Sequence, residues 1–212
     1  MKKCSLDFLT PYKDIGIMKT LSILSAALIT VGAGTLYFST TTEADVPPAK
    51  PVVKVTGDQL KLNGTATRTV LGGAVKVYQV GLYVTNPSKD EKAIYACRDK
   101  KRVQIKMLRE VSGKKFESTV RKNIAQNYSE AEQKKFSKLT EQFLGCFVEK
   151  TLAKNSVVDI DFIPGQGTEV LIDRKRVDLI PSDDYYHVLL RLWIGDPLQK
   201  SIKEGLLKGG TA

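Results

Sequence analysis

The sequence predicts an α+β fold in which helices pack on one antiparallel sheet. Short apolar runs separated by turn signals follow residue 52, and two pairs of helices come later, separated by a hairpin. Strand and helix do not alternate regularly, which argues against a parallel sheet built from β-α-β units. The chain has 212 residues, of which 42% are hydrophobic and 26% charged. This is the ordinary composition of a globular protein with one sizeable domain.

The first part of the domain is predicted to form an antiparallel meander. The run "QLKLNG" ends in an Asn-Gly turn, and "VTNPSKDE" breaks the following strand after Val84. A short helix is expected from Ala93 to Cys97, capped by Ser88 or Asp90. Apolar and polar residues then alternate in "RVQIKML", which is typical of a half-buried strand.

Two helices with one apolar face each are predicted in the middle of the chain. The first begins at Ser112-Gly113 and places three apolar residues at four-residue steps: Phe116, Val120 and Ile124. The second is expected to run from Ser129 to Lys150, with Ser129 and Glu132 forming a capping box. Its apolar residues recur at helical spacing and are interpreted as core: Phe136, Leu139, Phe143 and Phe147.

A hairpin and two further helices complete the predicted domain. Asp159 and Asp161 alternate with apolar residues in the first strand of the hairpin, so we expect both on the solvent side, where they add solubility. A helix is predicted to begin at Ser182 and to end at Gly195, and Pro197 opens a last amphipathic helix.

The strand within "RTVLGGAVKVYQVGLYV", from Arg68 to Val84, is predicted to be covered on both faces. A period of two places Gln79 and Tyr83 on one face and Tyr78 on the other, among apolar residues on both sides. A buried polar group without a partner costs on the order of 1–3 kcal/mol, so these side chains are expected to line a pocket. The alternative is structural: Arg68 caps an exposed hairpin, and Tyr78 keeps its hydroxyl in water.

Residues 1–44 are expected to form a secretory signal peptide or an N-terminal anchor. The segment from Thr20 to Thr42 contains no charged residue, and Lys19 stands directly before it. Thr42 and Ala44 fit the −3 and −1 positions of a cleavage site, but an apolar run of about 18–20 residues is also just long enough to span a bilayer. We therefore expect an exported, periplasmic protein, associated with a membrane only through this segment if it is not cleaved.

The rest of the chain divides into a linker and a domain. Residues 45–52 are rich in proline, as expected of an extended linker, and the folded domain is expected to span residues 53–212. The formal net charge of +10 favours anionic partners in general. Because no basic block is longer than "RDKKR" and the sequence contains no nucleic-acid-binding motif, we expect a dispersed basic surface and no nucleic-acid partner.

The cysteines and the single histidine predict no metal site. Cys4 precedes the signal core, and Cys97 and Cys146 either form a disulfide or remain two buried thiols. Spacing does not distinguish these alternatives. His187 has no Cys/His cluster around it. We interpret it as a packed or surface residue rather than a general base, because no nucleophile adjoins it in the sequence.

Four stretches of the chain together carry a resemblance to a known family. They are "GTATRTVLGGAVKVYQVGLYV", "VSGKKFESTVRKNI", "FIPGQGTEVLI" and "LLRLWIGDPLQKSIKEGLL". In this order they resemble the chalcone isomerase family, and the last is typical of its bacterial, exported chalcone-isomerase-like branch. The resemblance extends from Val55 to Gly209. It implies an open-faced β-sandwich, in which helices lie on one face of a large antiparallel sheet and a ligand cleft separates the two layers. We expect a monomer that needs no cofactor.

The resemblance also implies a set of candidate site residues. Arg68 matches the family's arginine, which holds an anionic phenolate or enolate in the isomerases and a carboxylate in the fatty-acid-binding relatives. Asn123 matches the family's helix asparagine. Phe116 stands where the family has its catalytic tyrosine, and Tyr78 stands where it has an assisting threonine. A late serine or threonine position of the family falls near Tyr186.

These departures from the family pattern decide the expected activity. Phenylalanine neither donates nor accepts a hydrogen bond, and the loss of one preorganised donor typically slows an enzyme about 10²–10³-fold. We therefore expect non-catalytic binding of a small amphipathic carboxylate such as a fatty acid. Arg68 would pair with its charge, and four residues would shape the pocket: Tyr78, Phe116, Val120 and Asn123. The alternatives are an intramolecular lyase or isomerase that uses Tyr78, and a basic module that contacts a membrane surface.

Overall fold

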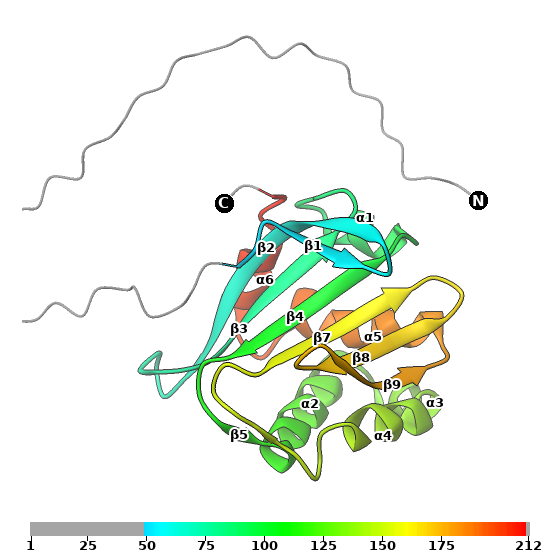
Figure 1. Ribbon diagram of the computed structural model, residues 1–212. Helices are drawn as coiled ribbons and strands as arrows, with labels where there is room; N and C mark the ends of the chain where they lie inside the picture. The colour runs from blue at the N-terminus through cyan, green and yellow to red at the C-terminus, as the bar shows by residue number, and fades with distance from the viewer. Residues whose placement is uncertain (1–48, 211–212) are drawn as a thin grey trace, which may run out of the picture. The chain divides into compact units, whose positions relative to one another are not determined.

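The computed structural model describes residues 49–210, so the predicted signal segment and half of the predicted linker lie outside the described residues. Seven antiparallel strands form one sheet in the order β1-β2-β3-β4-β7-β8-β9, and β5 and β6 form a separate pair (Figure 1). The strands are β1 (Val52–Val55), β2 (Asp58–Val70), β3 (Val75–Val84), β4 (Lys101–Met107), β5 (Val111–Ser112), β6 (Thr151–Leu152), β7 (Val157–Ile163), β8 (Gly167–Ile172) and β9 (Lys175–Ile180).

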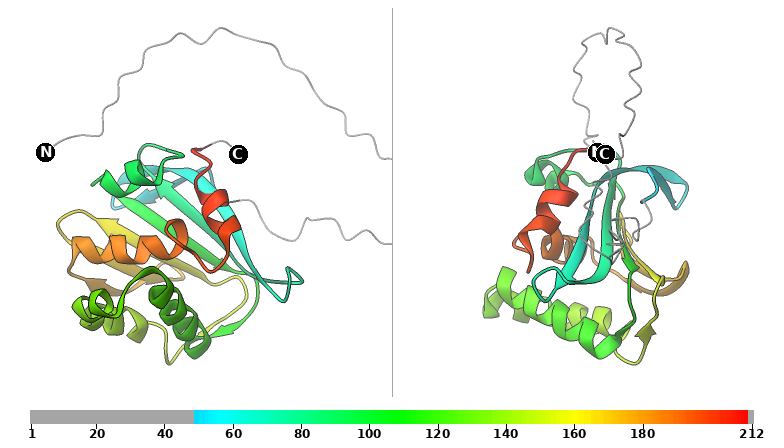
Figure 2. Two further views of the ribbon diagram at one scale, coloured as in Figure 1. Left: turned by 180° about the vertical axis from the view of Figure 1, so that it is seen from behind. Right: turned by 90° about the vertical axis from the view of Figure 1, so that its left-hand side faces the viewer.

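The helices gather on one side of this sheet, which confirms the predicted α+β class (Figure 2, right). They are α1 (Glu91–Ala96), α2 (Gly113–Asn127), α3 (Glu130–Lys135), α4 (Ser137–Gly145), α5 (Asp183–Ile194) and α6 (Lys200–Leu206). Within the described residues, no helix combines the length and the apolar character that crossing a membrane requires.

Alternation along β3 separates the two faces of the sheet as predicted. Val80 and Leu82 point into the core that the sheet shares with the helices. Tyr83 points to the opposite face, which we call the outer face, and packs there with Val55 and Leu60 of the β1–β2 hairpin. All five side chains are buried. Both faces of β3 are therefore covered in its second half, as predicted, whereas residues 75–79 are only partly buried or exposed.

Side-chain caps start the two helices that the sequence analysis places in the middle of the chain. The hydroxyl of Ser112 accepts a hydrogen bond from the backbone N–H of Lys115 and caps α2. Ser129 and Glu132 form the predicted capping box at the start of α3. Both caps satisfy N–H groups that a helix start would otherwise leave without a partner.

The predicted continuous helix to Lys150 is wrong. The backbone leaves the helical conformation at Phe136, where φ is −111° and ψ is 14°, and α4 then ends at Gly145. At the break the ring of Phe136 packs against the ring of Tyr128, with 5.0 Å between the centroids. The helical spacing of the phenylalanines identifies core residues correctly but does not reveal the break at Phe136.

The two aspartates of β7 also differ from their prediction. Asp159 and Asp161 lie on the outer face, as alternation requires, but they are only 3% and 1% exposed. Asp161 accepts two hydrogen bonds of 2.6 Å from Arg102, and Asp159 accepts one of 2.8 Å from Gln104. The expectation that they are solvated surface residues is wrong, because neighbouring strands and their side chains cover this part of the outer face.

Of the two alternatives for the cysteines, the disulfide is wrong. Cys97 follows the last turn of α1 and Cys146 that of α4, and both remain thiols. Burial raises the pKa of Cys146 to about 11. A thiol with a raised pKa is a poor nucleophile, and Cys146 is therefore a packing residue.

Helix α6 approaches β2 very closely because two glycines face each other where they cross. A Cβ atom at Gly64 would lie 2.2 Å from the carbonyl oxygen of Gly205, and one at Gly205 would lie 2.4 Å from the carbonyl oxygen of Thr65. Such contacts leave no room for a side chain. The close crossing holds Gln199, which directly precedes α6, against β2 beside Arg68.

Candidate functional site

A pocket of about 430 Å³ lies between the sheet and the helix layer, and we call it the inner pocket. The sheet contributes Tyr78 of β3 and Met107 of β4, and the helices contribute Val120 of α2 and Trp193 of α5. Its volume is in the range of small-molecule sites. The wall is mainly apolar, and charged residues reach it from the end of β2 and from the segment between β4 and α2.

The structure brings together five of the six predicted ligand-binding residues in this pocket. They are Arg68, Tyr78, Phe116, Val120 and Asn123. The three on α2 share one face because they are spaced at about one helical turn. Arg68 and Tyr78 are direct cross-strand partners on β2 and β3. A β-bulge follows immediately between Arg68 and Thr69. Such bulges change the direction in which neighbouring side chains point.

Hydrogen bonds hold the guanidinium of Arg68 at the pocket wall. Its Nη1 donates to the carbonyl oxygen of Thr69 at 2.8 Å and to Oε1 of Gln199 at 3.0 Å. The Gln199 amide in turn donates to the carbonyl oxygen of Thr67 at 3.1 Å. In the described part of the chain, no carboxylate forms an ion pair with Arg68. The positive charge is therefore fixed in position and available to an anionic group.

Tyr78 places a phenol close to this positive charge. Burial raises the pKa of Tyr78 above its usual range, although a hydrogen bond with Trp193 and the charge of Arg68 act in the opposite direction. The hydroxyl is therefore protonated at neutral pH and can donate a hydrogen bond. The side chain as a whole is partly buried and lines the inner pocket.

Asn123 and Phe116 mainly organise the helix wall. Nδ2 of Asn123 donates to the carbonyl oxygen of Leu192 at 2.8 Å, and its Oδ1 accepts a hydrogen bond of 3.1 Å from Asn127. The amide thus joins α2 to the end of α5. The ring of Phe116 packs on the ring of Phe147, with 4.6 Å between the centroids. Phe116 supplies apolar surface at a position where the family resemblance implies a hydroxyl.

Tyr186 does not line the inner pocket, so its predicted placement is wrong. It is 0% exposed and stacks on Phe162, with 5.2 Å between the ring centroids. The pocket is instead lined by Trp193, which sequence reasoning missed. Trp193 lies seven residues after Tyr186, which is about two helical turns along the same face of α5. The amphipathic pattern of this helix indicated the face, and only the position along the helix was misjudged.

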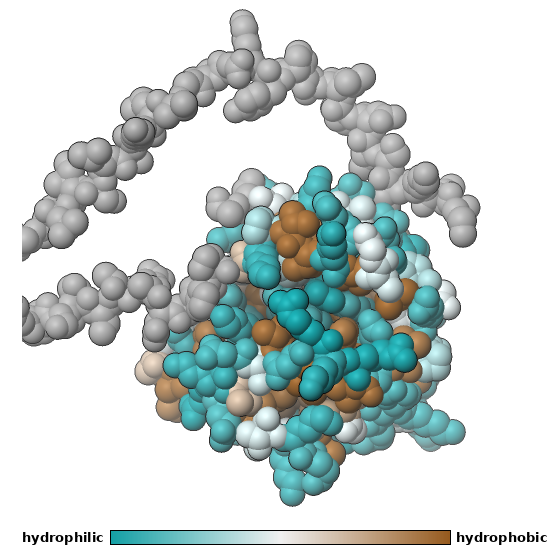
Figure 3. Space-filling model, viewed as in Figure 1, coloured by the Kyte–Doolittle hydropathy of each residue, from teal (hydrophilic) through white to brown (hydrophobic). Residues whose placement is uncertain are grey.

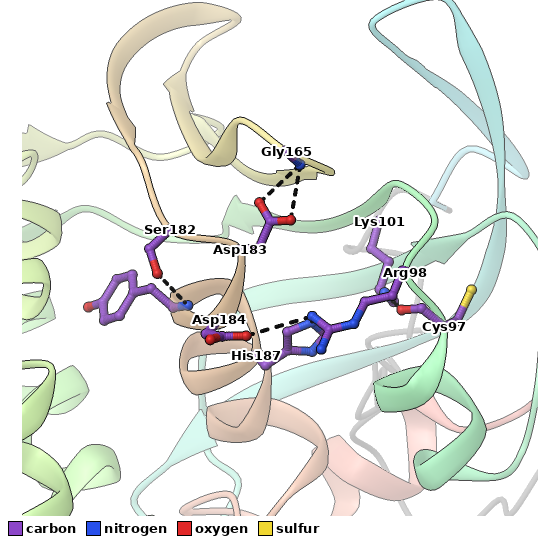
Figure 4. A network of polar contacts seen from close by, with 9 residues as sticks. Cys97, Arg98, Lys101, Gly165, Ser182, Asp183, Asp184 and His187 are labelled. Carbon is purple, nitrogen blue, oxygen red and sulfur yellow. Dashed lines mark hydrogen bonds and ion pairs between the residues drawn. The ribbon is translucent and has the colours of Figure 1, made fainter. Parts of the chain in front are cut away.

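His187 belongs to a polar network at another place on α5 (Figure 4). Its Nε2 lies 3.3 Å from Nη1 of Arg98, and the same Nη1 lies 3.7 Å from Oδ1 of Asp184. The imidazole also contacts the ring of Phe162, with 5.5 Å between the centroids. The half-buried ring packs among aromatic and basic neighbours, as the sequence-based interpretation expects. Among residues 49–210 we find no cluster of side chains that could hold a metal ion.

Replacing His187 with glutamine is expected to reduce the loss of thermal stability that the protein shows as the pH falls from 7 to 4. The pKa of His187 is lowered from 6.5 to about 4, mainly by burial; the charges of Lys101 and Arg98 act in the same direction, and those of Asp184 and Asp183 oppose them. A depressed histidine pKa contributes stability that is present above pH 6.5 and is lost as the pH falls through 4. Thermal unfolding between pH 7 and pH 4 should therefore show a smaller decrease in Tm for His187→Gln, by a few degrees because the half-exposed ring is partly screened. Parallel curves for the two proteins would contradict the assignment.

Comparisons with known proteins agree with this fold. The family described as "Chalcone isomerase-like" matches residues 39–208. The crystal structure of a fatty-acid binding protein of Arabidopsis thaliana has a TM-score of 0.54 and 18% sequence identity to this chain. The similarity covers 75% of this chain and 97% of that one, and at such low identity it shows the fold alone. No protein of curated function matches the sequence.

Proposed function

Since the chain belongs to the chalcone isomerase-like family, we propose that its inner pocket binds a small amphipathic carboxylate, such as a fatty acid, without converting it. The single observation that carries this proposal is the position of Arg68. A permanently charged guanidinium lies at the wall of a mainly apolar pocket, held by Gln199 and without a carboxylate partner among the described residues. The carboxylate of an amphipathic ligand would supply the missing anion, and its alkyl chain would fill the apolar space.

The residues around Arg68 favour binding over catalysis. Phe116 offers no proton and no hydrogen bond at the position where the family's catalytic tyrosine is expected. Asn123 is engaged between α2 and α5. The solved structure from Arabidopsis thaliana is of a fatty-acid binding protein, which gives independent support to a ligand of this class.

Lipid extraction tests the proposal directly. The protein would be purified without detergent, extracted with organic solvent, and its extract examined by mass spectrometry. We expect acyl carboxylates in a fixed molar ratio to the protein, and their loss from Arg68→Met protein purified in parallel. An extract without acyl chains, together with no uptake of added palmitate by the purified protein, would contradict the proposal.

The affinity for a fatty acid is expected to depend on Arg68 through charge. Hydrogen bonds to charged groups contribute about 1.5–3 kcal/mol, so Arg68→Met should weaken binding of palmitate by roughly ten- to a hundredfold. Isothermal titration calorimetry with the delipidated protein measures this change. Hexadecanol has the same alkyl chain without the carboxylate, so the substitution should change its affinity little.

Arg98→Met is the matched control, because Arg98 is an exposed arginine whose recorded contacts are with the His187 network. It should leave the binding of both ligands unchanged. An equal loss of palmitate and hexadecanol binding in Arg68→Met would indicate altered pocket shape rather than charge recognition.

Tyr78 supports a second candidate, an intramolecular lyase or isomerase. Its protonated hydroxyl lies in the inner pocket near Arg68 and Trp193, so it could donate to a substrate oxygen that gains negative charge. Turnover of chalcone-like enones that disappears in Tyr78→Phe would favour this candidate. Turnover that is equal in both proteins would exclude Tyr78 as the donor.

We also propose that the protein is exported and acts outside the cytoplasm, on the basis of its N-terminal sequence alone. The uncharged stretch after Lys19 and the small residues at Thr42 and Ala44 support cleavage. N-terminal sequencing of the protein from fractionated cells tests this: a start at Asp45 is expected, and an intact N-terminus in the cytoplasmic fraction would contradict it.

A further inference from the structure

A second pocket lies on the outer face of the sheet, opposite the helix layer, and we call it the outer pocket. Its volume is about 460 Å³, which is also in the range of small-molecule sites. Strand β1 supplies one wall, and neighbouring residues of β3, β4 and β7 form the floor. Figure 3 shows the molecule from the same side as Figure 1, with the outer face toward the viewer, and hydrophilic residues occupy much of this face.

The floor of the outer pocket carries charged side chains that are fixed in position. Arg102 donates from Nε and Nη2 to the two oxygens of Asp161, each at 2.6 Å. Asp159 lies beside this pair, with its Oδ1 3.6 Å from Nε of Arg102 and 2.8 Å from Nε2 of Gln104. The side chains of Arg102, Asp159 and Asp161 are 12%, 5% and 1% exposed. Buried ion pairs add little net stability, because desolvation offsets their attraction, whereas fixed polar groups in a cleft are typical of functional sites.

The hydroxyl of Tyr83 lies within this polar surrounding without a partner. Tyr83 lines the outer pocket and is 0% exposed, and its hydroxyl forms no hydrogen bond within the described residues. A Cβ atom at Gly81 would lie 3.1 Å from Cε2 of Tyr83, so the ring uses the space that this glycine leaves. Burial and the charge of Asp159 raise the pKa of Tyr83 to about 12. The hydroxyl is therefore a protonated donor at neutral pH, and leaving it unpaired costs about 1–3 kcal/mol.

The rim of the outer pocket is basic. Lys50, Lys54, Lys106 and Arg174 line it, and Asp159 is the one acidic residue among the described lining residues. An occupant thus meets cations near the opening and both a donor and an acceptor at the floor. An anionic group suits the rim, and hydroxyl groups suit the floor, since a hydroxyl both donates and accepts.

We propose that the outer pocket binds a small anion that carries hydroxyl groups, such as a phosphorylated polyol. Its anionic group lies among the basic side chains of the rim, and its hydroxyls accept from Tyr83 and donate to Asp159. The pocket is on the opposite side of the sheet from Arg68 and shares none of the residues assigned to the carboxylate ligand. This inference therefore holds or fails independently of the function proposed above.

The test uses the full-length chain and three probes that separate the two parts of the ligand. Glycerol 3-phosphate carries both the anion and the hydroxyls, inorganic phosphate carries the anion alone, and glycerol carries the hydroxyls alone. Calorimetric titration should show saturable binding of glycerol 3-phosphate, weaker binding of phosphate and none of glycerol. Tyr83→Phe removes one hydroxyl that has no partner in the described protein, so the fold should persist while the affinity for glycerol 3-phosphate falls about tenfold or more.

Tyr186→Phe is the matched control. Tyr186 is the other fully buried tyrosine whose hydroxyl has no partner among the described residues, but it lies on α5, stacks on Phe162 and does not line the outer pocket. It should leave binding unchanged, and Lys106→Gln should weaken binding. The proposal is overturned if glycerol 3-phosphate does not saturate a site up to about 10 mM. It is also overturned if Tyr83→Phe and Tyr186→Phe bind this probe equally well, because such binding would involve surface lysines only.

Discussion

Replacing Asp161 with alanine is expected to destabilise the domain by about 3–5 kcal/mol, which is typical of removing one partner from a buried ion pair. Arg102 would lose both hydrogen bonds of 2.6 Å and would keep its charge in a place where its side chain is 12% exposed. Asp159, at 3.6 Å, compensates only in part. Urea unfolding monitored by circular dichroism measures the change, and the Tm should fall by roughly 10 °C.

A double variant separates the loss of the ion pair from the loss of packing. In Arg102→Met/Asp161→Leu both charges are replaced by apolar groups of similar length, and such replacements are often neutral or stabilising. We therefore expect the double variant to be clearly more stable than Asp161→Ala. If Asp161→Ala changes the unfolding free energy by less than about 1 kcal/mol, the aspartate is solvated and the buried arrangement on the outer face is wrong.

The inner pocket was predictable from sequence to the extent that it depends on local periodicity. A period of two in β3 placed Tyr78 on the face opposite Tyr83, and helical spacing in α2 placed Phe116 and Val120 on one face. The family resemblance named Arg68 and Tyr78 separately as site residues, and the structure shows that they are cross-strand partners on β2 and β3. Each of these relations connects residues that are close in sequence or joined by one turn.

The relations that could not be predicted connect distant segments. Gln199 reaches Arg68 because α6 crosses β2 at Gly64 and Gly205, and nothing in the local sequence identifies these two glycines as partners. The burial of Asp159 follows in the same way from what covers the outer face rather than from alternation in β7. Alternation assigns a side chain to a face of the sheet, but only the arrangement of the whole chain decides whether that face is solvated.

The two pockets use the sheet in different ways. On the helix side, strand residues meet apolar residues from α2 and α5, so Arg68 lies in a mainly apolar wall, to which Arg109, Glu110 and Lys115 add further charges. On the outer face, cross-strand neighbours on β4 and β7 are polar and hydrogen-bonded to one another. An amphipathic ligand suits the first arrangement and a hydrophilic ligand suits the second, because apolar surface is best covered by apolar groups and buried polar groups need hydrogen-bond partners.

Filling the inner pocket is expected to abolish binding of fatty acids while the domain stays folded. Val120 lies on the pocket-facing side of α2, one turn after Phe116, so the indole of Val120→Trp would occupy space that an alkyl chain needs. We expect the affinity for palmitate to fall by roughly a hundredfold or more, and the affinity for hexadecanol to fall equally, because both ligands lose the same apolar space. This equal loss distinguishes the variant from Arg68→Met, which should affect only the binding of the carboxylate.

Val177→Trp, at a partly exposed position on β9, is the control and should leave both affinities unchanged. Full binding by a folded Val120→Trp protein would show that fatty acids occupy another site and would remove the inner pocket from the proposed function.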